Sequence, residues 1–255
     1  MFRILALSLA LFALPARADE VDFSADGGLV WSQKDMTITL SRNAAAKTAD
    51  YTLLADEIVG RYRADKKIYR LVAAGAVRID SRADSIRSDK LDYDLEKDFI
   101  LLSPDAGREV YMKSKDSEVF SPRPVEYRRA EGYASALDAR IVHAGRRLFA
   151  DRMKIMFNSA GEMTRALGHG RIRIIDGEME LYGDEAEYNP STGISIVSGN
   201  VYFKKGLAAD LKGGRIVYDM NTGVANVLPK QGEKISGRFS TDKKDGGGKE
   251  PDAKN

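Results

Sequence analysis

Two halves of this sequence repeat each other at a fixed distance of 95 residues. Positions in the region 51–103 have counterparts 95 residues later in the region 147–198 without a gap, and many of these pairs are identical or similar. Self-similarity at a fixed period indicates stacked units that bury one continuous core together. The identical pairs include Asp56 and Asp151, Gly75 and Gly170, Arg78 and Arg173, Ile79 and Ile174, Asp89 and Asp184, and Tyr93 and Tyr188.

Apolar and charged residues alternate along most of these units. Val77 and Ile79 alternate with Arg78 and Asp80, and the same pattern recurs in the second half. Period-two alternation is typical of an antiparallel strand with one buried face and one wet face. Helical spacing is weak almost everywhere, so the sequence predicts an all-β protein.

The stretch from Gly183 to Phe203 predicts a β-hairpin. Its two strands are separated by residues 189–193, where Pro190 sets the first corner of the turn and Gly193 supplies a positive φ. We expect Ala186 and Tyr188 to share the buried face with residues of the second strand. The inward residues predicted there are Ile194 and Ile196.

The two ends of the chain differ from its middle. Residues 1–18 have a basic start, an apolar run from Ile4 to Leu14 and an Ala16-Arg17-Ala18 site, which predicts a cleaved signal peptide and export to the periplasm. Removal of Arg3 and Arg17 lowers the formal charge from +2 to zero, so nucleic acid is not an expected partner. We therefore predict one β-domain over residues 19–235 and a disordered polar tail over residues 236–255.

The sequence offers little for catalysis or metal binding. It has no Cys and only two His residues, His143 and His169, which we expect on a strand and at the start of a strand. The Gly residues form no phosphate-binding motif. Asp89, Asp92 and Asp94 could act as paired carboxylates of a glycan hydrolase. Their repeat counterparts favour turn and outer-face roles instead, so we expect no enzyme activity, catalytic residue, metal or cofactor.

Several short phrases in order resemble the OstA-like family of periplasmic lipopolysaccharide-transport proteins. They are DYTLLADE at residues 50–57, AAGAVRI at residues 73–79 and YNPSTG at residues 188–193, followed by SGNV at residues 198–201. The resemblance implies an open, twisted antiparallel β-jellyroll of about sixteen short strands. It also implies transport of lipopolysaccharide with its lipid A acyl chains in an apolar groove. The segment 113–145 looks long for the family, and it could form either extra strands or a lateral flap.

The same resemblance implies partners. Copies of the chain would associate head to tail through edge strands, and the ends of the stack would pair with inner-membrane LptC-like and outer-membrane LptD-like proteins. Two alternatives stay open, namely an LptC-like component that keeps residues 4–14 as an anchor and a structural β-repeat protein without lipid cargo. The inward-facing residues predicted to bind lipid are Leu91, Tyr93, Ile155, Phe157, Ile172, Ile174, Tyr188, Ile196, Phe203 and Tyr218.

Overall fold

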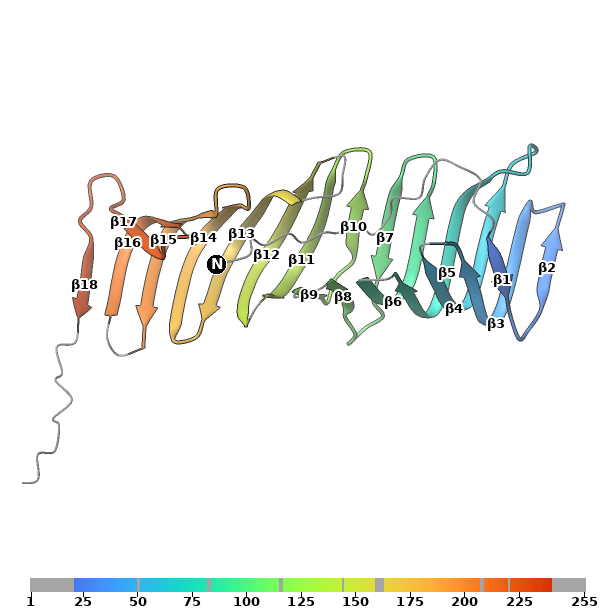
Figure 1. Cartoon of the computed structure of the whole chain (residues 1–255), viewed down its shortest axis with the longest axis horizontal. Helices are drawn as coiled ribbons and strands as arrows, with labels where there is room; N and C mark the ends of the chain where they lie inside the picture. Colours follow the sequence, from blue (N-terminus) through green and yellow to red (C-terminus); the bar gives the residue numbers. More distant parts are fainter. Residues whose placement is uncertain are drawn as a thin grey trace, which may run out of the picture.

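The computed structural model describes residues 21–49, 51–81, 84–114, 117–143, 145–158, 163–206, 209–219 and 221–239. Within these residues every regular element is a strand, and every pairing is antiparallel. The strands lie side by side along the long axis of the molecule, from β2 at one end to β18 at the other (Figure 1). They are β1 (Asp22–Ser24), β2 (Leu29–Ser32), β3 (Thr37–Lys47), β4 (Thr52–Tyr62), β5 (Ile68–Asp80), β6 (Asp84–Asp94), β7 (Phe99–Ser103), β8 (Val110–Ser114), β9 (Ser117–Ser121), β10 (Val125–Arg128), β11 (Tyr133–His143), β12 (Arg146–Phe157), β13 (Met163–Asp176), β14 (Met179–Asn189), β15 (Ile194–Lys205), β16 (Ala209–Asp219), β17 (Val224–Leu228) and β18 (Ser236–Phe239).

The strands form two layers that share the long strands. One part of β6 pairs with β7 and the other part pairs with β8, and β3, β11 and β16 divide in the same way. Layer I contains the short strands β2, β7, β10 and β17, and layer II contains β1, β8, β9 and β18. The long strands β3–β6 and β11–β16 contribute one segment to each layer, which makes the fold a jellyroll.

The long strands pass between the layers at irregularities in their pairing. Register shifts occur at Leu54/Glu57 and at Ala74/Val77, and again at the corresponding positions of the second half. Gly75 and Gly170 have φ angles of 77° and 75°, and each lies against the repeated Asp of the preceding strand. A β-bulge of this kind bends a strand and increases its twist. The recurring Asp and Gly therefore lie where β4, β5, β12 and β13 change layer.

The bend also changes which residues of a strand face inward. In β12 the inward residues are Leu148 and Ala150 before Asp151, but Met153 and Ile155 after it. The inward set moves by one position because the bulge inserts an extra residue. The same shift follows Asp56 in β4, Asp89 in β6 and Asp184 in β14.

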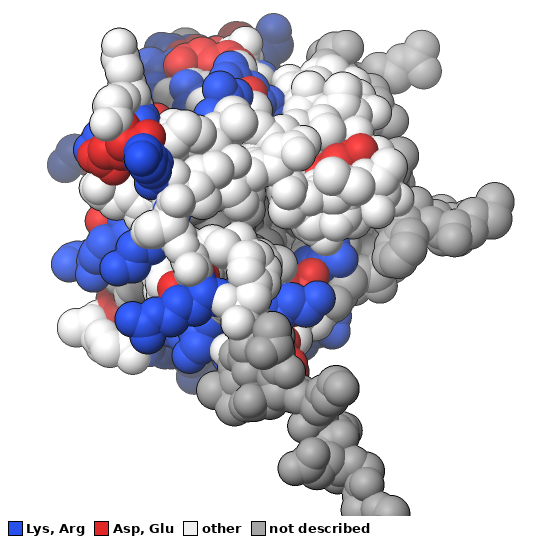
Figure 2. Space-filling model, turned by 90° about the vertical axis from the view of Figure 1, so that its left-hand side faces the viewer, with Lys and Arg blue, Asp and Glu red and all other residues white. Residues whose placement is uncertain are grey.

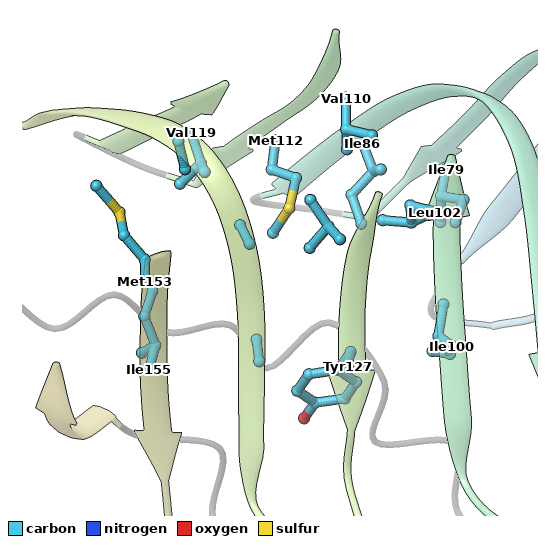
Figure 3. Close-up of a cluster of buried hydrophobic side chains, with 14 of the residues drawn as sticks. Ile79, Ile86, Ile100, Leu102, Val110, Met112, Val119, Tyr127, Met153 and Ile155 are labelled. Carbon is cyan, nitrogen blue, oxygen red and sulfur yellow. The ribbon is translucent and has the colours of Figure 1, made fainter. Parts of the chain in front are cut away.

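The core lies between the two layers. Figure 3 shows Ile100, Leu102, Tyr127, Met153 and Ile155 of layer I together with side chains from the other layer. Many of these side chains are completely enclosed, and Ile86, Ile100 and Val110 are each only 1% exposed. Burial of large aliphatic side chains stabilises a fold by roughly 1.5–3 kcal/mol each, so this protein without Cys is held by its packing. The layer II members of the cluster that Figure 3 labels are Ile79, Ile86, Val110, Met112 and Val119.

The predicted fold class, an open antiparallel β-jellyroll, is confirmed. The segment 113–145 does not form a flap, because β8 and β9 insert in layer II between β6 and β11, while β10 inserts in layer I between β7 and β11. The sheet continues four residues past the domain boundary expected at residue 235. Ser236–Phe239 form β18, since their backbone pairs with the layer II part of β16 although their side chains stay exposed. The predicted signal peptide and the rest of the predicted tail lie outside the described residues.

Candidate lipid-binding interior

Three unbroken rows of inward-facing residues run along the interior. Residues that lie directly opposite each other in an antiparallel pair share a face of the sheet, so the rows follow from the register. They cross the molecule from the β1 and β2 end to the β17 and β18 end. The first row of layer I is Leu29, Leu40, Ile58, Ala73, Leu91, Leu102, Val125, Ala136, Met153, Gly168, Ala186, Val197, Ile216 and Val227. The second is Trp31, Ile38, Gly60, Leu71, Tyr93, Ile100, Tyr127, Ala134, Ile155, Ala166, Tyr188, Ser195, Tyr218 and Ala225. The row of layer II is Phe23, Ala46, Leu53, Ile79, Ile86, Met112, Val119, Ile141, Leu148, Ile174, Leu181, Phe203, Leu211 and Gly237.

A cavity of about 130 Å³ lies between the layers in the second half of the molecule. Small residues of layer I, Ala166, Gly168 and Ala186, line it where larger side chains would fill the space. Leu148 and Ile174 face them from layer II. An engineered apolar cavity of about 150 Å³ stays dry and binds benzene, so this cavity suits a short apolar group in the structure as it stands.

Nine of the ten predicted lipid-binding residues fall into three groups by their surroundings. Leu91, Tyr93, Phe157 and Ile172 belong to the filled core, each at most 9% exposed. Ile155, Ile174 and Tyr188 line the cavity. Phe203 and Tyr218 line a smaller adjoining space of about 30 Å³, which Ile174 also borders.

The inward orientation predicted for Ile196 is wrong. Tyr188 lies opposite Ser195, and Ile196 lies opposite Glu187. Ile196 also lies opposite Val217, which places it on the outer face, while Ser195 and Val197 point inward. The turn from Asn189 to Ile194 sets this register, and a hydrogen bond from Gly193 N to Asn189 O closes it. The length of the turn places Ser195, and not Ile196, opposite Tyr188. Ile194, the other inward residue predicted in this strand, lies next to inward Ser195 and so shares the outer side.

Several inward tyrosines carry hydroxyl groups in this apolar interior, and three of them have a raised pKa. Burial raises the pKa of Tyr93, and its hydroxyl donates to Asp98 Oδ1 over 3.2 Å. Burial also raises the pKa of Tyr127 and of Tyr188. The raised pKa follows because a phenolate loses its hydration when it is enclosed. These three phenol groups therefore stay neutral.

Polar residues border the layer II row along one side, and the sequence prediction missed them. We call Asp84, Ser114, Ser117, His143 and Arg146 the polar margin; each lies opposite the next in the register. Asp84, Ser114 and Ser117 are buried, and Ser117 and His143 are joined by a hydrogen bond of 2.7 Å. The sequence did indicate these residues, because each one continues the alternation of inward and outward residues in its strand. His143, expected on a strand, is only half-exposed.

The acidic residues considered for catalysis each form an ion pair with a basic side chain. Asp89 is buried, where its carboxylate contacts Arg108 over 2.7 Å and accepts from the backbone N of Asp105. Asp92 forms an ion pair with Arg70 on the outer face, and Asp94 pairs with Lys97. These carboxylates do not converge on a common cleft. Among the described residues there is also no group of His, Cys, Asp and Glu that could hold a metal ion.

Both ends of the two-layer body expose apolar side chains beside strands that pair with a described strand on one side only. β2 pairs with β3, and its Val30 and Trp31 are 64% and 54% exposed. At the opposite end Val224 and Phe239 of β17 and β18 are exposed. Figure 2 views this second end, where uncharged residues cover much of the surface and Lys and Arg gather toward its margins. None of the described residues forms a helix that is long and apolar enough to cross a membrane.

Comparison with known proteins adds a family match. Residues 138–224 match the family model described as LptA/(LptD N-terminal domain) LPS transport protein. This segment runs from β11 to the start of β17 and includes most of the strands that line the cavity. No curated protein matches the chain. Among solved structures, the chain is similar to LptH, the LptA homologous periplasmic component of the conserved lipopolysaccharide transport device from Pseudomonas aeruginosa. The identity is 9%, the match covers 87% of this chain and 96% of that chain, and the TM-score is 0.24.

Proposed function

We propose that this chain is a periplasmic lipopolysaccharide-transport protein of the OstA-like family with the bridging role of LptA. The observation that carries the proposal is the set of apolar rows, which run between the layers from one end of the molecule to the other. The family-model match over residues 138–224 supports the same function. The cargo is the lipid A part of lipopolysaccharide, and the protein acts without catalysis or a cofactor.

Acyl chains lie between the layers in this proposal. Each methylene that moves from water into an apolar environment contributes roughly 0.8 kcal/mol, so even a partly inserted chain is held firmly. The cavity of about 130 Å³ is the first place of insertion, because the neighbouring interior is already filled by side chains. A longer acyl chain requires the two layers to separate along the side of the jellyroll.

The two ends provide the connections. Exposed backbone at a sheet edge can pair with the edge of another chain, and apolar side chains beside it strengthen the contact. We propose that the β2 end of one copy pairs with the β17 and β18 end of the next, which makes the interior continuous. The end copies of such a stack would pair with inner-membrane LptC-like and outer-membrane LptD-like proteins.

Site-specific photocrosslinking tests the cargo. A photoreactive amino acid replaces Tyr188, which lines the cavity, or Arg173, which is exposed on the outer face of the neighbouring strand. In Gram-negative cells the variant at position 188 should form adducts with lipopolysaccharide, and the variant at position 173 should not. Equal yields at the two positions, or no adduct at 188, would contradict the proposal and favour a structural β-repeat protein.

A second experiment separates the LptA-like role from the LptC-like role. Mass spectrometry of the exported protein should find a mature chain that begins at Asp19. A chain that retains Met1 would favour the membrane-anchored role.

A further inference from the structure

The polar margin meets the cavity at one place. Ser117, His143 and Arg146 line the same cavity as the apolar side chains of Leu148 and Ile174. Ser117 is buried, and the side chain of Arg146 is only about one-third exposed. Polar groups and a cation therefore stand directly beside an apolar space of about 130 Å³.

The guanidinium group of Arg146 is held in a defined orientation. Its Nε donates to Asp176 Oδ2 over 2.7 Å. Its two terminal nitrogens, Nη1 and Nη2, donate to none of the described residues, so one edge of the planar group remains available. Arg146 and Tyr188 of layer I line the same cavity. The positive charge of Arg146 accordingly opposes the rise in the pKa of Tyr188 that burial causes.

Each acidic group at this place is paired with an arginine. Asp176 is engaged by Arg146, and Glu187, which also borders the cavity, is engaged by Arg165 over 2.7 Å. Ser117 and His143 are joined to each other at 2.7 Å. A hydroxyl group and a ring nitrogen thus lie beside the guanidinium group of the next strand, since His143 is directly opposite Arg146.

We propose that Arg146, His143 and Ser117 form a headgroup site for an amphiphile whose head is anionic and whose acyl tail occupies the adjoining cavity. The inference rests on the proposed function and adds to it the place where the anionic group binds. Guanidinium binds phosphate and carboxylate through two parallel hydrogen bonds, and such charge-assisted bonds are stronger than neutral ones. Partial burial reduces competition from water, which strengthens the contact.

The test uses binding of single-chain amphiphiles below their micelle concentrations by isothermal titration calorimetry. The probes are dodecyl phosphate, sodium dodecanoate and the uncharged dodecyl maltoside, which share a tail of the same length. We expect the wild-type protein to bind dodecyl phosphate more tightly than dodecyl maltoside. Tighter binding of the phosphate than of the carboxylate assigns the site to a phosphorylated lipid, and the reverse assigns it to a fatty acid.

Arg146→Gln should weaken dodecyl phosphate binding by about tenfold, the effect of losing a charge-assisted contact, and should leave dodecyl maltoside binding unchanged. The matched control is Arg152→Gln, which removes an exposed cation from the outer face of the same strand. An equal loss in the two variants, or no loss in Arg146→Gln, would overturn the headgroup site. If the wild-type protein binds none of the three probes, both the headgroup site and the proposed lipid-carrier function are contradicted.

Discussion

Leucine at position 166 should make the protein more stable and less able to hold lipid. Ala166 lies between Ile155 and Tyr188 in the second row of layer I, and it lines the cavity. An unfilled cavity costs about 24 cal/mol per Å³, so the 130 Å³ space corresponds to about 3 kcal/mol. A leucine side chain adds three carbons and fills part of this space, and we expect a gain of about 1–2 kcal/mol.

The gain can be measured as a rise in the midpoint of thermal unfolding. For a chain of this size each kcal/mol corresponds to about 2–4 °C. The same variant should reduce the yield of lipopolysaccharide crosslinks from position 188, because the added side chain occupies the place proposed for the acyl tail.

Ala73→Leu is the matched control. Ala73 belongs to the first row of layer I and is fully enclosed at 0% exposure. Overfilling a close-packed site costs about 1–3 kcal/mol, so the same substitution should here lower the midpoint. If Ala166→Leu destabilises the protein as much as Ala73→Leu, the cavity is not an open space in solution. If it stabilises the protein while crosslinking at 188 persists, lipid does not lie in the cavity.

Three further predictions address the bends, the edges and the interior tyrosines. Gly170→Ala should lower the free energy of unfolding in urea by more than Gly177→Ala. Both glycines have positive φ, but only at position 170 would the new methyl group meet Asp151, at 2.5 Å. Equal losses in the two variants would contradict the role of Gly170 in the bend. Val30→Lys should prevent head-to-tail association, measured as particle mass by light scattering, without changing the thermal midpoint, since a charge on an exposed edge strand opposes pairing. If the wild-type protein associates and the variant has the same particle mass, association does not use the β2 edge. Tyr93→Phe should reduce the fall in stability above about pH 10. The raised pKa of Tyr93 keeps its phenol neutral in the folded protein, while the same phenol ionises in the unfolded chain. The same dependence of the urea midpoint on pH in the two proteins would refute this account.

The inward-facing residues show how far the sequence could be followed. Alternation identified Ile155, Ile174 and Tyr188, because the residues leading up to each of them alternate between polar and apolar. It failed for Ile196, where the phase after the turn depends on which residues pair across it, and Ser195 rather than Ile196 faces Tyr188. The polar margin was missed for a related reason. Its members come from five strands and line up only through the pairing of those strands.

The sequence by itself determined the class of fold and the positions of the bends. Alternation with a period of two fits only a strand, and the Asp and Gly that recur at an interval of 95 residues mark the points where strands change layer. Only the tertiary structure decided which residues face the interior beyond each bend, since one inserted residue exchanges the two faces of a strand. It also decided where the interior is filled and where it is hollow, because a cavity depends on how side chains from distant strands meet across the two layers.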